Sequence, residues 1–241
     1  MKRAVLVTAS SRGLGEEIAR QFLKEGCTVI INGRNMDRLR EILTDFGDVY
    51  RFHQDMTIEG SVENLRRFID ENGLLVDCAV NCLGGRLAGD GHPIDQDILE
   101  HTLRLNLKTA VEINSMLIPS MIKLGGGKIF HIGSSAGYTG NAAPCYAISK
   151  GALNTYIKNS ARYYAKDSIM ICGILPGILD HDGSDWDNKR KEDPEKYYSR
   201  MKAMPMGVFQ KPTDIAPVII SIYKSGTMAL TGSIIEAAGG M

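Results

Sequence analysis

The stretch RAVLVTASSRGLGEEIA, residues 3–19, decides the fold of this chain. It opens with an apolar run of strand length, passes through Gly13 and Gly15, and enters a segment whose apolar side chains, from Ile18 to Leu23, follow a helical period. A strand that turns through glycines into a helix is the first unit of a sheet covered by helices. The stretch therefore predicts an α/β fold.

The same alternation of strand and helix continues along the chain. Apolar runs such as TVIING (residues 28–33), LLVDCAV (74–80) and IMICGIL (169–175) alternate with segments of helical period. Runs that are apolar on both faces are typical of parallel strands buried between helices, and their connections are right-handed. We therefore expect a single domain, residues 1–241, built on a three-layer, doubly wound parallel sheet of the Rossmann type.

Composition and charge exclude several function classes. The 241 residues are 44% hydrophobic and 23% charged, which is ordinary for a compact globular protein. The chain has 28 basic and 28 acidic residues, so it has no overall field that would attract nucleic acid or an anionic membrane. No apolar run reaches transmembrane length, and the run after Lys2 and Arg3 is too short for a signal peptide. We expect a cytoplasmic protein that binds neither nucleic acid nor membranes.

The five cysteines are scattered and do not form a disulfide framework. Cys78 and Cys82 have no second Cys or His pair nearby at the spacing of a zinc site. We therefore expect reduced thiols and no metal.

The glycines of the first turn favour a nucleotide. Gly13 and Gly15 let backbone N–H groups approach a phosphate, and the following helix contributes its positive N-terminal end. The standard six-residue dinucleotide fingerprint is absent, and a glycine pair alone is also compatible with a tight turn that binds nothing.

The end of the second predicted strand bears on the choice of cofactor. NAD binding normally uses an acidic residue about 20 residues after the glycines, which bonds the ribose 2′-hydroxyl. This chain has Asn32 and Arg34 in that region. Arg34, together with Arg12 before the first glycine, is suited to pair with a 2′-phosphate, although arginines in general mostly face solvent. The pattern predicts NADP(H) rather than NAD(H).

The stretch YAISK, residues 146–150, supplies a candidate catalytic pair. Tyr146 and Lys150 share one face of a helix because they are four residues apart. By itself such a pair is more often an ordinary feature of a helix surface. Here the strand GKIFHIGSS, residues 127–135, ends in Ser134 at the carboxyl edge of the sheet, where ligands bind in this type of fold. We expect the three polar groups to converge there.

Most of the chain resembles the short-chain dehydrogenase/reductase family and is similar to its bacterial 3-oxoacyl-(acyl-carrier-protein) reductases. The stretches that carry the resemblance are TASSRGLG, VNCLGG, LNLKTA, IGSSAG, YAISK, LPG and MPMGVFQKPTDIA. The resemblance implies a catalytic tetrad of Asn106, Ser134, Tyr146 and Lys150. It also implies hydride transfer between a nicotinamide and a ketone or alcohol carbon.

In this reading each member of the tetrad has its own task. Tyr146 donates the proton, and the ammonium of Lys150 lowers the tyrosine pKa from its usual value of about 10. Ser134, with Ser135 as a nearby competitor, holds the substrate oxygen. By the resemblance, Lys150 also binds the nicotinamide ribose, and Asn106 supports the lysine through a water.

The resemblance extends to the cofactor contacts, and the chain departs from the family pattern at a few positions. Ala9 stands where the family has its first turn glycine, Cys82 and Leu83 replace asparagine and alanine, His181 stands near a common threonine, and Ala238 replaces a common aspartate. The implied contacts are Ser10, Arg12, Gly13, Leu14, Gly15, Arg34, Asp55, Met56, Asn81, Gly84, Tyr146, Lys150, Pro176 and Gly177.

A charged segment of about residues 179–205 interrupts the family pattern. It contains the only tryptophan, Trp186, among several aspartates. One interpretation is a solvated loop, and the other is a variable lid that closes over the substrate. Polar groups in such a lid favour a polar keto substrate, such as a hydroxylated or sugar-like molecule.

Other functions remain open from the sequence. An NAD-linked alcohol or nucleotide-sugar dehydrogenase of the same fold is one alternative, and a non-catalytic nucleotide-binding sensor or scaffold is another. By family resemblance, the helices around residues 99–121 and 146–164 pair between subunits. We therefore expect a homodimer or homotetramer that acts on a small-molecule carbonyl or alcohol.

Overall fold

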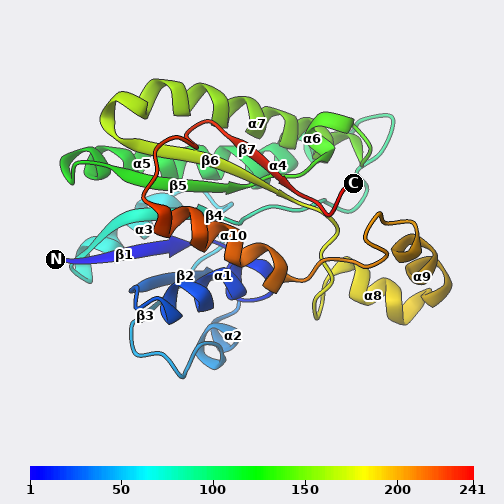
Figure 1. Cartoon of the computed structure of the whole chain (residues 1–241), viewed down its shortest axis with the longest axis horizontal. Helices are drawn as coiled ribbons and strands as arrows, with labels where there is room; N and C mark the ends of the chain where they lie inside the picture. The colour runs from blue at the N-terminus through cyan, green and yellow to red at the C-terminus, as the bar shows by residue number, and fades with distance from the viewer.

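The computed structural model describes all 241 residues and contains one seven-stranded sheet, in the order β3-β2-β1-β4-β5-β6-β7. All the strand pairs are parallel. The strands are β1 (Lys2–Val7), β2 (Val29–Gly33), β3 (Val49–His53), β4 (Leu74–Asn81), β5 (Gly127–Ile132), β6 (Ile169–Pro176) and β7 (Ile234–Ala237). The predicted doubly wound parallel sheet is confirmed (Figure 1).

Helices connect the strands and cover both faces of the sheet (Figure 1). The main helices are α1 (Gly13–Lys24), α2 (Met36–Glu41), α3 (Ser61–Glu71), α4 (Gln96–Leu103), α5 (Thr109–Lys123), α7 (Pro144–Tyr164) and α10 (Pro212–Ser225). The other helical elements are the π-helical turn η1 (Arg104–Lys108), α6 (Ala136–Thr139), the 3₁₀ turn η2 (Ala165–Asp167), α8 (Asp185–Glu192) and α9 (Pro194–Lys202).

The core consists of two apolar layers, one on each face of the sheet. Along β1, Val5 and Val7 pack into the layer that includes α1 and α10, whereas Ala4 and Leu6 pack into the layer that includes α3, α5 and α7. Successive strand residues point to opposite faces, so a strand that is apolar throughout is buried on both sides. This is the physical reason that the apolar runs in the sequence predicted a three-layer fold.

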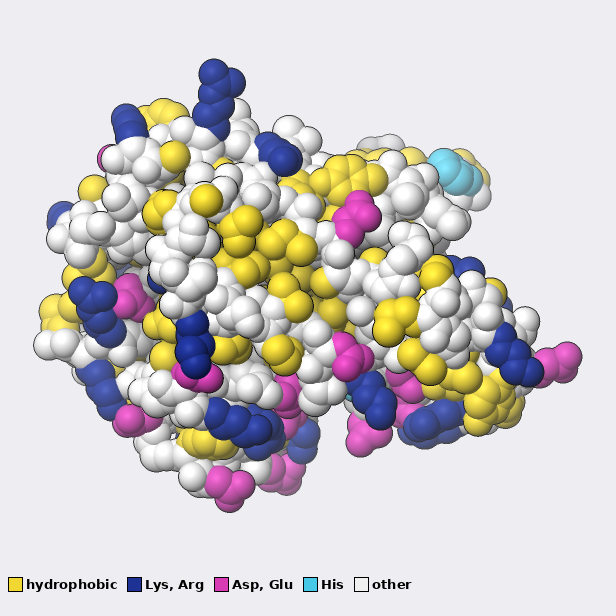
Figure 2. Space-filling model, in the orientation of Figure 1, with side chains coloured by type: hydrophobic (Ala, Val, Ile, Leu, Met, Phe, Trp, Pro, Cys, Tyr) yellow, Lys and Arg dark blue, Asp and Glu magenta, His cyan; other side chains and the backbone are white.

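Segment 179–205 folds into two helices, α8 and α9, beyond the ends to which the strand arrows point (Figure 1). Its residues Tyr197 and Met204 form a small apolar cluster with Phe209, which follows the segment, and Trp186 packs against this cluster. In the space-filling view the segment stands out from the body of the molecule, and its visible face mixes basic and acidic side chains (Figure 2). No helix of the protein has both the length and the apolar character needed to cross a bilayer.

Candidate active site

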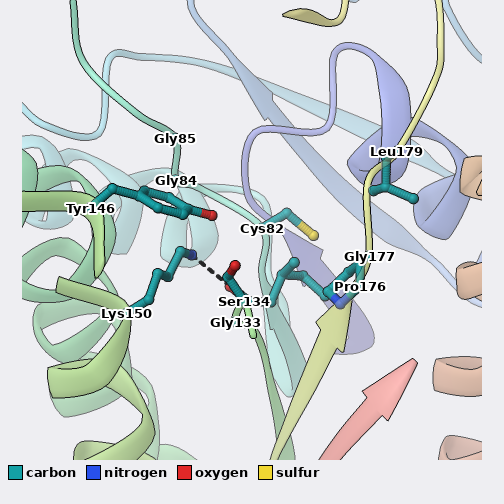
Figure 3. Close-up of a pocket in the computed structure, with 11 residues that line it drawn as sticks. Cys82, Gly84, Gly85, Gly133, Ser134, Tyr146, Lys150, Pro176, Gly177 and Leu179 are labelled. Atoms are coloured by element: carbon teal, nitrogen blue, oxygen red, sulfur yellow. Dashed lines mark hydrogen bonds between the residues drawn. The ribbon is translucent and has the colours of Figure 1, made fainter. Parts of the chain in front are cut away.

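A cavity of about 180 Å³ opens at the carboxyl edge of the sheet. The side chains of Tyr146 and Lys150 enter it from α7, Ser134 follows β5, and two glycine-containing turns enclose the rest (Figure 3). Its lining residues are Cys82, Gly84, Gly85, Ile132, Gly133, Ser134, Tyr146, Lys150, Pro176, Gly177 and Leu179. The structure thus brings together Ser134, Tyr146 and Lys150, as the sequence predicted.

Lys150 is buried beneath the cavity. Its Nζ donates a hydrogen bond of 2.9 Å to the carbonyl oxygen of Ile132 and lies 5.7 Å from the centre of the Tyr146 ring. Burial lowers the pKa of Lys150 to about 8, because the charged ammonium loses hydration there. The lysine therefore titrates close to neutral pH.

The pKa of Tyr146 shifts in the opposite direction from the sequence-based expectation. Burial raises it above its usual value, and the nearby hydroxyl of Ser134 only partly offsets this effect. Lys150 does not lower it in this structure, since the ammonium is directed to the carbonyl of Ile132. The phenol is therefore held in its protonated, proton-donating form.

Asn106 lies in the π-helical turn η1, behind the cavity lining. Its amide clamps Gly85 at both backbone groups: Nδ2 donates to the carbonyl oxygen and Oδ1 accepts from the N–H, each at 2.9 Å. Nδ2 also donates to the carbonyl of Thr102. A π-turn inside a helix is often found at functional sites. The two hydrogens of Nδ2 are thus donated to Gly85 and Thr102. Any support that Asn106 gives to Lys150 must therefore come from Oδ1 or from its backbone.

Gly84 has no room for a side chain because the side chains of Asn106 and Lys150 crowd it. A Cβ at this position would lie 2.7 Å from Oδ1 of Asn106 and 3.0 Å from Nζ of Lys150. The bare backbone therefore keeps open the space between the lysine and the cavity. This feature fits a site that admits a flat ring next to the lysine.

The first turn has the shape that the glycines predicted. Gly13 has φ 58°, and a Cβ on Gly15 would lie 2.5 Å from the carbonyl oxygen of Ala9. Ala9 itself adopts φ 49°, the left-handed conformation for which glycine is favoured. The alanine in place of the family glycine is therefore held in a strained backbone conformation.

Asn32, at the end of β2, holds this turn from below. Its side chain accepts from the N–H of Ala9 at 3.3 Å and donates to the carbonyls of Phe52 and Gln54. The amide is buried and joins the ends of three strands. It occupies the position at which NAD-binding proteins place a carboxylate, but its bonds are all internal.

Arg34 and Asp55 lie together at the end of the sheet beyond Asn32. Their side chains form an ion pair at 3.6 Å, in which Arg34 is 76% exposed. Burial works to raise the pKa of Asp55, but hydrogen bonds from Thr57 and the charge of Arg34 outweigh it and lower the pKa. Arg38, which the sequence reasoning missed, donates to the carbonyl of Ser11 in the first turn and pairs with Glu16.

Four other predicted cofactor contacts have side chains in the interior: Ser10, Leu14, Met56 and Asn81. The hydroxyl of Ser10 donates to the carbonyl of Val7, and the amide of Asn81 donates to Asn114. These side chains therefore support the fold of this edge of the sheet and are not exposed to a ligand.

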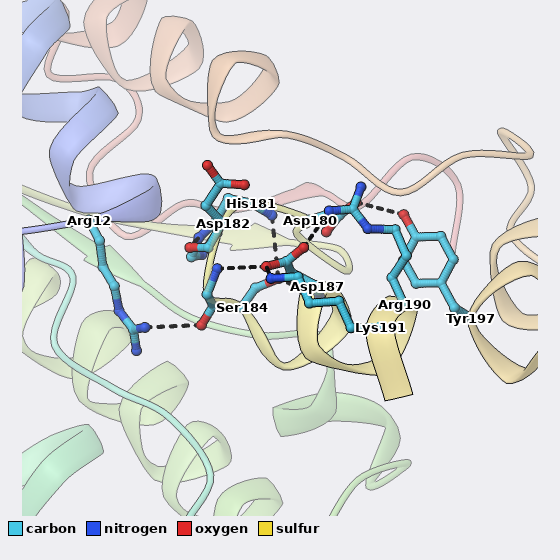
Figure 4. Close-up of polar contacts among 10 residues, drawn as sticks. Arg12, Asp180, His181, Asp182, Ser184, Asp187, Arg190, Lys191 and Tyr197 are labelled. Atoms are coloured by element: carbon cyan, nitrogen blue, oxygen red, sulfur yellow. Dashed lines mark hydrogen bonds and ion pairs between the residues drawn. The ribbon is translucent and has the colours of Figure 1, made fainter. Parts of the chain in front are cut away.

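Arg12 and His181 lie where segment 179–205 crosses the first turn. Nη1 of Arg12 donates to the carbonyl of Gly183 at 3.0 Å (Figure 4). The ring of His181 packs against Gly13, so that a Cβ on the glycine would lie 2.5 Å from Nε2. The resemblance places His181 near a position where the family often has a threonine. In this structure its imidazole covers the glycine turn.

Two aspartates of the segment are bound by other side chains of the same segment (Figure 4). The hydroxyl of Tyr197 donates to Asp180 at 2.6 Å. Asp187 is buried and pairs with Arg190 and Lys191, which together with the N–H of Gly183 hold its pKa well below the usual range. These groups stabilise the segment, so only its remaining polar groups are free to meet a ligand.

Comparison with known proteins supports a specific family. The short chain dehydrogenase family model matches residues 3–193. The chain is 26% identical to the 3-oxoacyl-(acyl-carrier-protein) reductase FabG of Aquifex aeolicus, over 98% of this chain and 96% of the relative.

Two solved structures extend the comparison. L-sorbose reductase of Gluconobacter frateurii, complexed with NADPH and L-sorbose, has 25% identity and a TM-score of 0.89, over 100% of this chain and 96% of that one. A 7α-hydroxysteroid dehydrogenase, complexed with NADH and 7-oxo glycochenodeoxycholic acid, has 25% identity and a TM-score of 0.88, with 99% and 93% covered. The chain therefore belongs to the short-chain dehydrogenase family and is an NAD(P)-dependent oxidoreductase of CH–OH or C=O groups in small molecules.

Proposed function

We propose that this protein is an NADPH-dependent reductase of a small polar ketone, with Asn106, Ser134, Tyr146 and Lys150 as its catalytic machinery. The observation that carries the proposal is the convergence of the last three side chains in one cavity. A chance pair on a helix surface would leave the lysine exposed, whereas Lys150 is 3% exposed.

The chain's residues divide the work of proton transfer and charge stabilisation. A bound nicotinamide would supply the hydride to the carbonyl carbon. Tyr146 is protonated and donates its hydroxyl hydrogen to the carbonyl oxygen, while the hydroxyl of Ser134 donates a hydrogen bond to the same oxygen. Lys150, whose pKa is about 8, is able to return a proton to the tyrosine near neutral pH. Asn106 fixes the Gly85 turn that bounds the cavity.

The preference for NADPH is supported by the charges around the first turn. Asn32 carries a neutral amide, so it does not repel a 2′-phosphate as a carboxylate would. The amide is also buried and donates to the carbonyls of Phe52 and Gln54. Arg34 is exposed and held only by an ion pair with Asp55, which in an exposed setting is weak. Both guanidinium groups, those of Arg34 and Arg12, are able to exchange their present partners for a phosphate.

The proposed substrate class is supported by a relative. The similar L-sorbose reductase holds a sugar. We assign segment 179–205 as the lid over this substrate. Its first residue, Leu179, follows β6 and lines the cavity.

Two or more copies of the chain are expected to assemble through α5 and α7. These helices expose Ile122, Ile148 and Tyr163 at 40%, 46% and 62%. Exposed apolar side chains on neighbouring helices are typical of subunit interfaces. Analytical ultracentrifugation should show a dimer or tetramer, and a monomer at micromolar concentration would contradict the assembly.

Fluorescence titration with NADPH and NADH tests the cofactor preference. The wild-type protein should bind NADPH more tightly, and Arg34→Ala should weaken NADPH binding by roughly 10-fold or more with little effect on NADH. A carbonyl library is then screened with NADPH, with Tyr146→Phe as a variant that should retain cofactor binding and lose about 10²–10⁴-fold in kcat. Equal or tighter binding of NADH, or an active Tyr146→Phe, would contradict the proposal.

A further inference from the structure

The helix that carries Tyr146 and Lys150 begins without any cap from its own sequence. Ala143, at the cap position, has no side-chain acceptor, and Pro144 at the first helical position has no N–H. The first free backbone donors of α7 are therefore the N–H groups of Cys145 and of Tyr146 itself.

Asp90 satisfies both donors from a distant part of the chain. Its Oδ1 accepts from the N–H of Cys145 at 2.9 Å, and its Oδ2 accepts from the N–H of Tyr146 at 3.0 Å. The residue belongs to the connection between β4 and α4, and its own N–H donates to the carbonyl of Leu87. Burial works to raise the pKa of Asp90, but the two N–H groups and the charge of Arg86 outweigh it, so the carboxylate stays ionised at neutral pH.

Residues 84–90 contact three members of the proposed tetrad. Gly85 is clamped by Asn106, Gly84 lies against Nζ of Lys150, and Asp90 binds the backbone of Tyr146. Gly84 and Gly85 also line the cavity. This loop is therefore a common support for groups that come from η1 and α7.

We propose that Asp90 is a positioning residue for carbonyl reduction, which fixes the backbone of Tyr146 relative to the loop of residues 84–90. This inference rests on the proposed role of Tyr146 as proton donor. Both oxygens of one carboxylate hold successive N–H groups, so the start of α7 is prevented from rotating or fraying. The phenol hydroxyl is carried by the same residue, and a small displacement of a reacting group has a large effect on rate.

The test compares Asp90→Ala and Asp90→Asn with a matched control, Asp214→Ala. Asp214 bonds the N–H of Lys211 at 2.7 Å at the start of α10, which packs in the other core layer. The control also removes a carboxylate at a helix start, but away from Tyr146. Each variant is assayed for kcat, KM, NADPH affinity and the solvent deuterium isotope effect, with a carbonyl substrate that the wild-type protein reduces.

Asp90→Ala should lower kcat by about 10- to 100-fold, with NADPH affinity changed by less than about twofold. The solvent isotope effect should increase, because proton donation by Tyr146 then limits turnover. Asp90→Asn keeps one acceptor oxygen, so its kcat should lie between those of the wild type and Asp90→Ala, about threefold below wild type. Asp214→Ala should leave kcat and the isotope effect unchanged.

A wild-type kcat in Asp90→Ala, or an equal loss in Asp214→Ala, would overturn the positioning role. If Asp90→Ala does not fold, the test rests on Asp90→Asn. A wild-type kcat together with a wild-type isotope effect in Asp90→Asn would also overturn the positioning role. Tyr146→Phe separates this inference from the proposed function. An inactive Tyr146→Phe beside a fully active Asp90→Ala contradicts only the inference, whereas an active Tyr146→Phe contradicts the function on which it rests.

Discussion

The imidazole of His181 lies against Gly13, at the centre of the turn where the cofactor phosphates are expected. A Cβ on the glycine would be 2.5 Å from Nε2 of the histidine. Two residues further along the chain, Gly183 accepts a hydrogen bond from Arg12 on the opposite side of the turn. The segment thus lies across the turn that we propose for the cofactor phosphates, and on that proposal the ring must move before a dinucleotide reaches the face of Gly13 that it covers.

Substitution of His181 by alanine should therefore tighten cofactor binding. The variant removes the ring that competes for the glycine turn, so a larger fraction of the molecules is ready to bind. We expect the Kd of NADPH to fall by about 2- to 10-fold, measured by fluorescence titration. An increased Kd would instead mean that the imidazole contributes to phosphate binding, and the competition described above would be wrong.

Substitution of Ala9 by glycine should stabilise the protein. Ala9 has φ 49°, a conformation that costs an L-residue roughly 1–2 kcal/mol and glycine very little. The greater freedom of glycine in the unfolded chain offsets part of this gain. We expect a net increase of about 0.5–1 kcal/mol in the free energy of unfolding, measured by urea denaturation. A less stable variant would contradict the strain assigned to this turn.

His131 should make the stability of the protein decrease in acid. Burial, aided by the charge of Lys150, lowers its pKa to about 3, and the neutral ring accepts a hydrogen bond from Asn114 at 3.0 Å. In the unfolded chain its pKa is about 6.5, so below that pH the unfolded state binds the proton first. This contribution to stability is complete above about pH 6.5 and is lost as the pH falls toward about 3, by up to about 1.4 kcal/mol per pH unit.

Urea denaturation between about pH 7 and pH 5 measures this slope. The comparison is with His131→Gln, which keeps a neutral polar side chain and cannot titrate. The wild-type protein should lose stability more steeply than the variant as the pH falls. Parallel slopes would show that His131 does not differ in pKa between the folded and unfolded states.

Asp187 should control the order of α8. Its side chain is 1% exposed and accepts from the N–H of Gly183 and from Lys191. Asp187→Asn removes the charge that both Arg190 and Lys191 bind, so it should speed hydrogen exchange and proteolytic cleavage within residues 181–193. The neighbouring Asp185→Asn, an exposed position, serves as the control. Equal protection in the two variants would contradict the structural role of Asp187.

The sequence predicted those features that depend on local pattern. Strands that are apolar on both faces and helices of clear period specified the layers, and parallel strands necessarily bring their carboxyl ends to one edge. For this reason Ser134 and the pair Tyr146 and Lys150 were expected to converge, and they do. The glycines of the first turn likewise predicted a tight passage from strand to helix, and in the structure β1 turns through Gly13, at φ 58°, into α1.

Features that depend on contacts between distant residues could not be predicted. The bond between Asp90 and Tyr146 joins two segments with no shared sequence signal. The expected effect of Lys150 on the pKa of Tyr146 was wrong for this structure, because the carbonyl of Ile132 takes the ammonium. The aspartates of segment 179–205 indicated a solvated loop or a polar lid. Two of these aspartates, Asp180 and Asp187, are instead bound by side chains inside the segment.

The position of Trp186 gives the protein an intrinsic optical reporter. It is the only tryptophan in the chain, and its ring lies 4.8 Å from that of Phe209 within the apolar cluster of the segment over the cavity. All tryptophan emission therefore originates in α8, and none comes from the sheet. Opening of the segment should shift the emission toward the red as water reaches the indole, so that its movement during a single turnover can be followed without attaching any label.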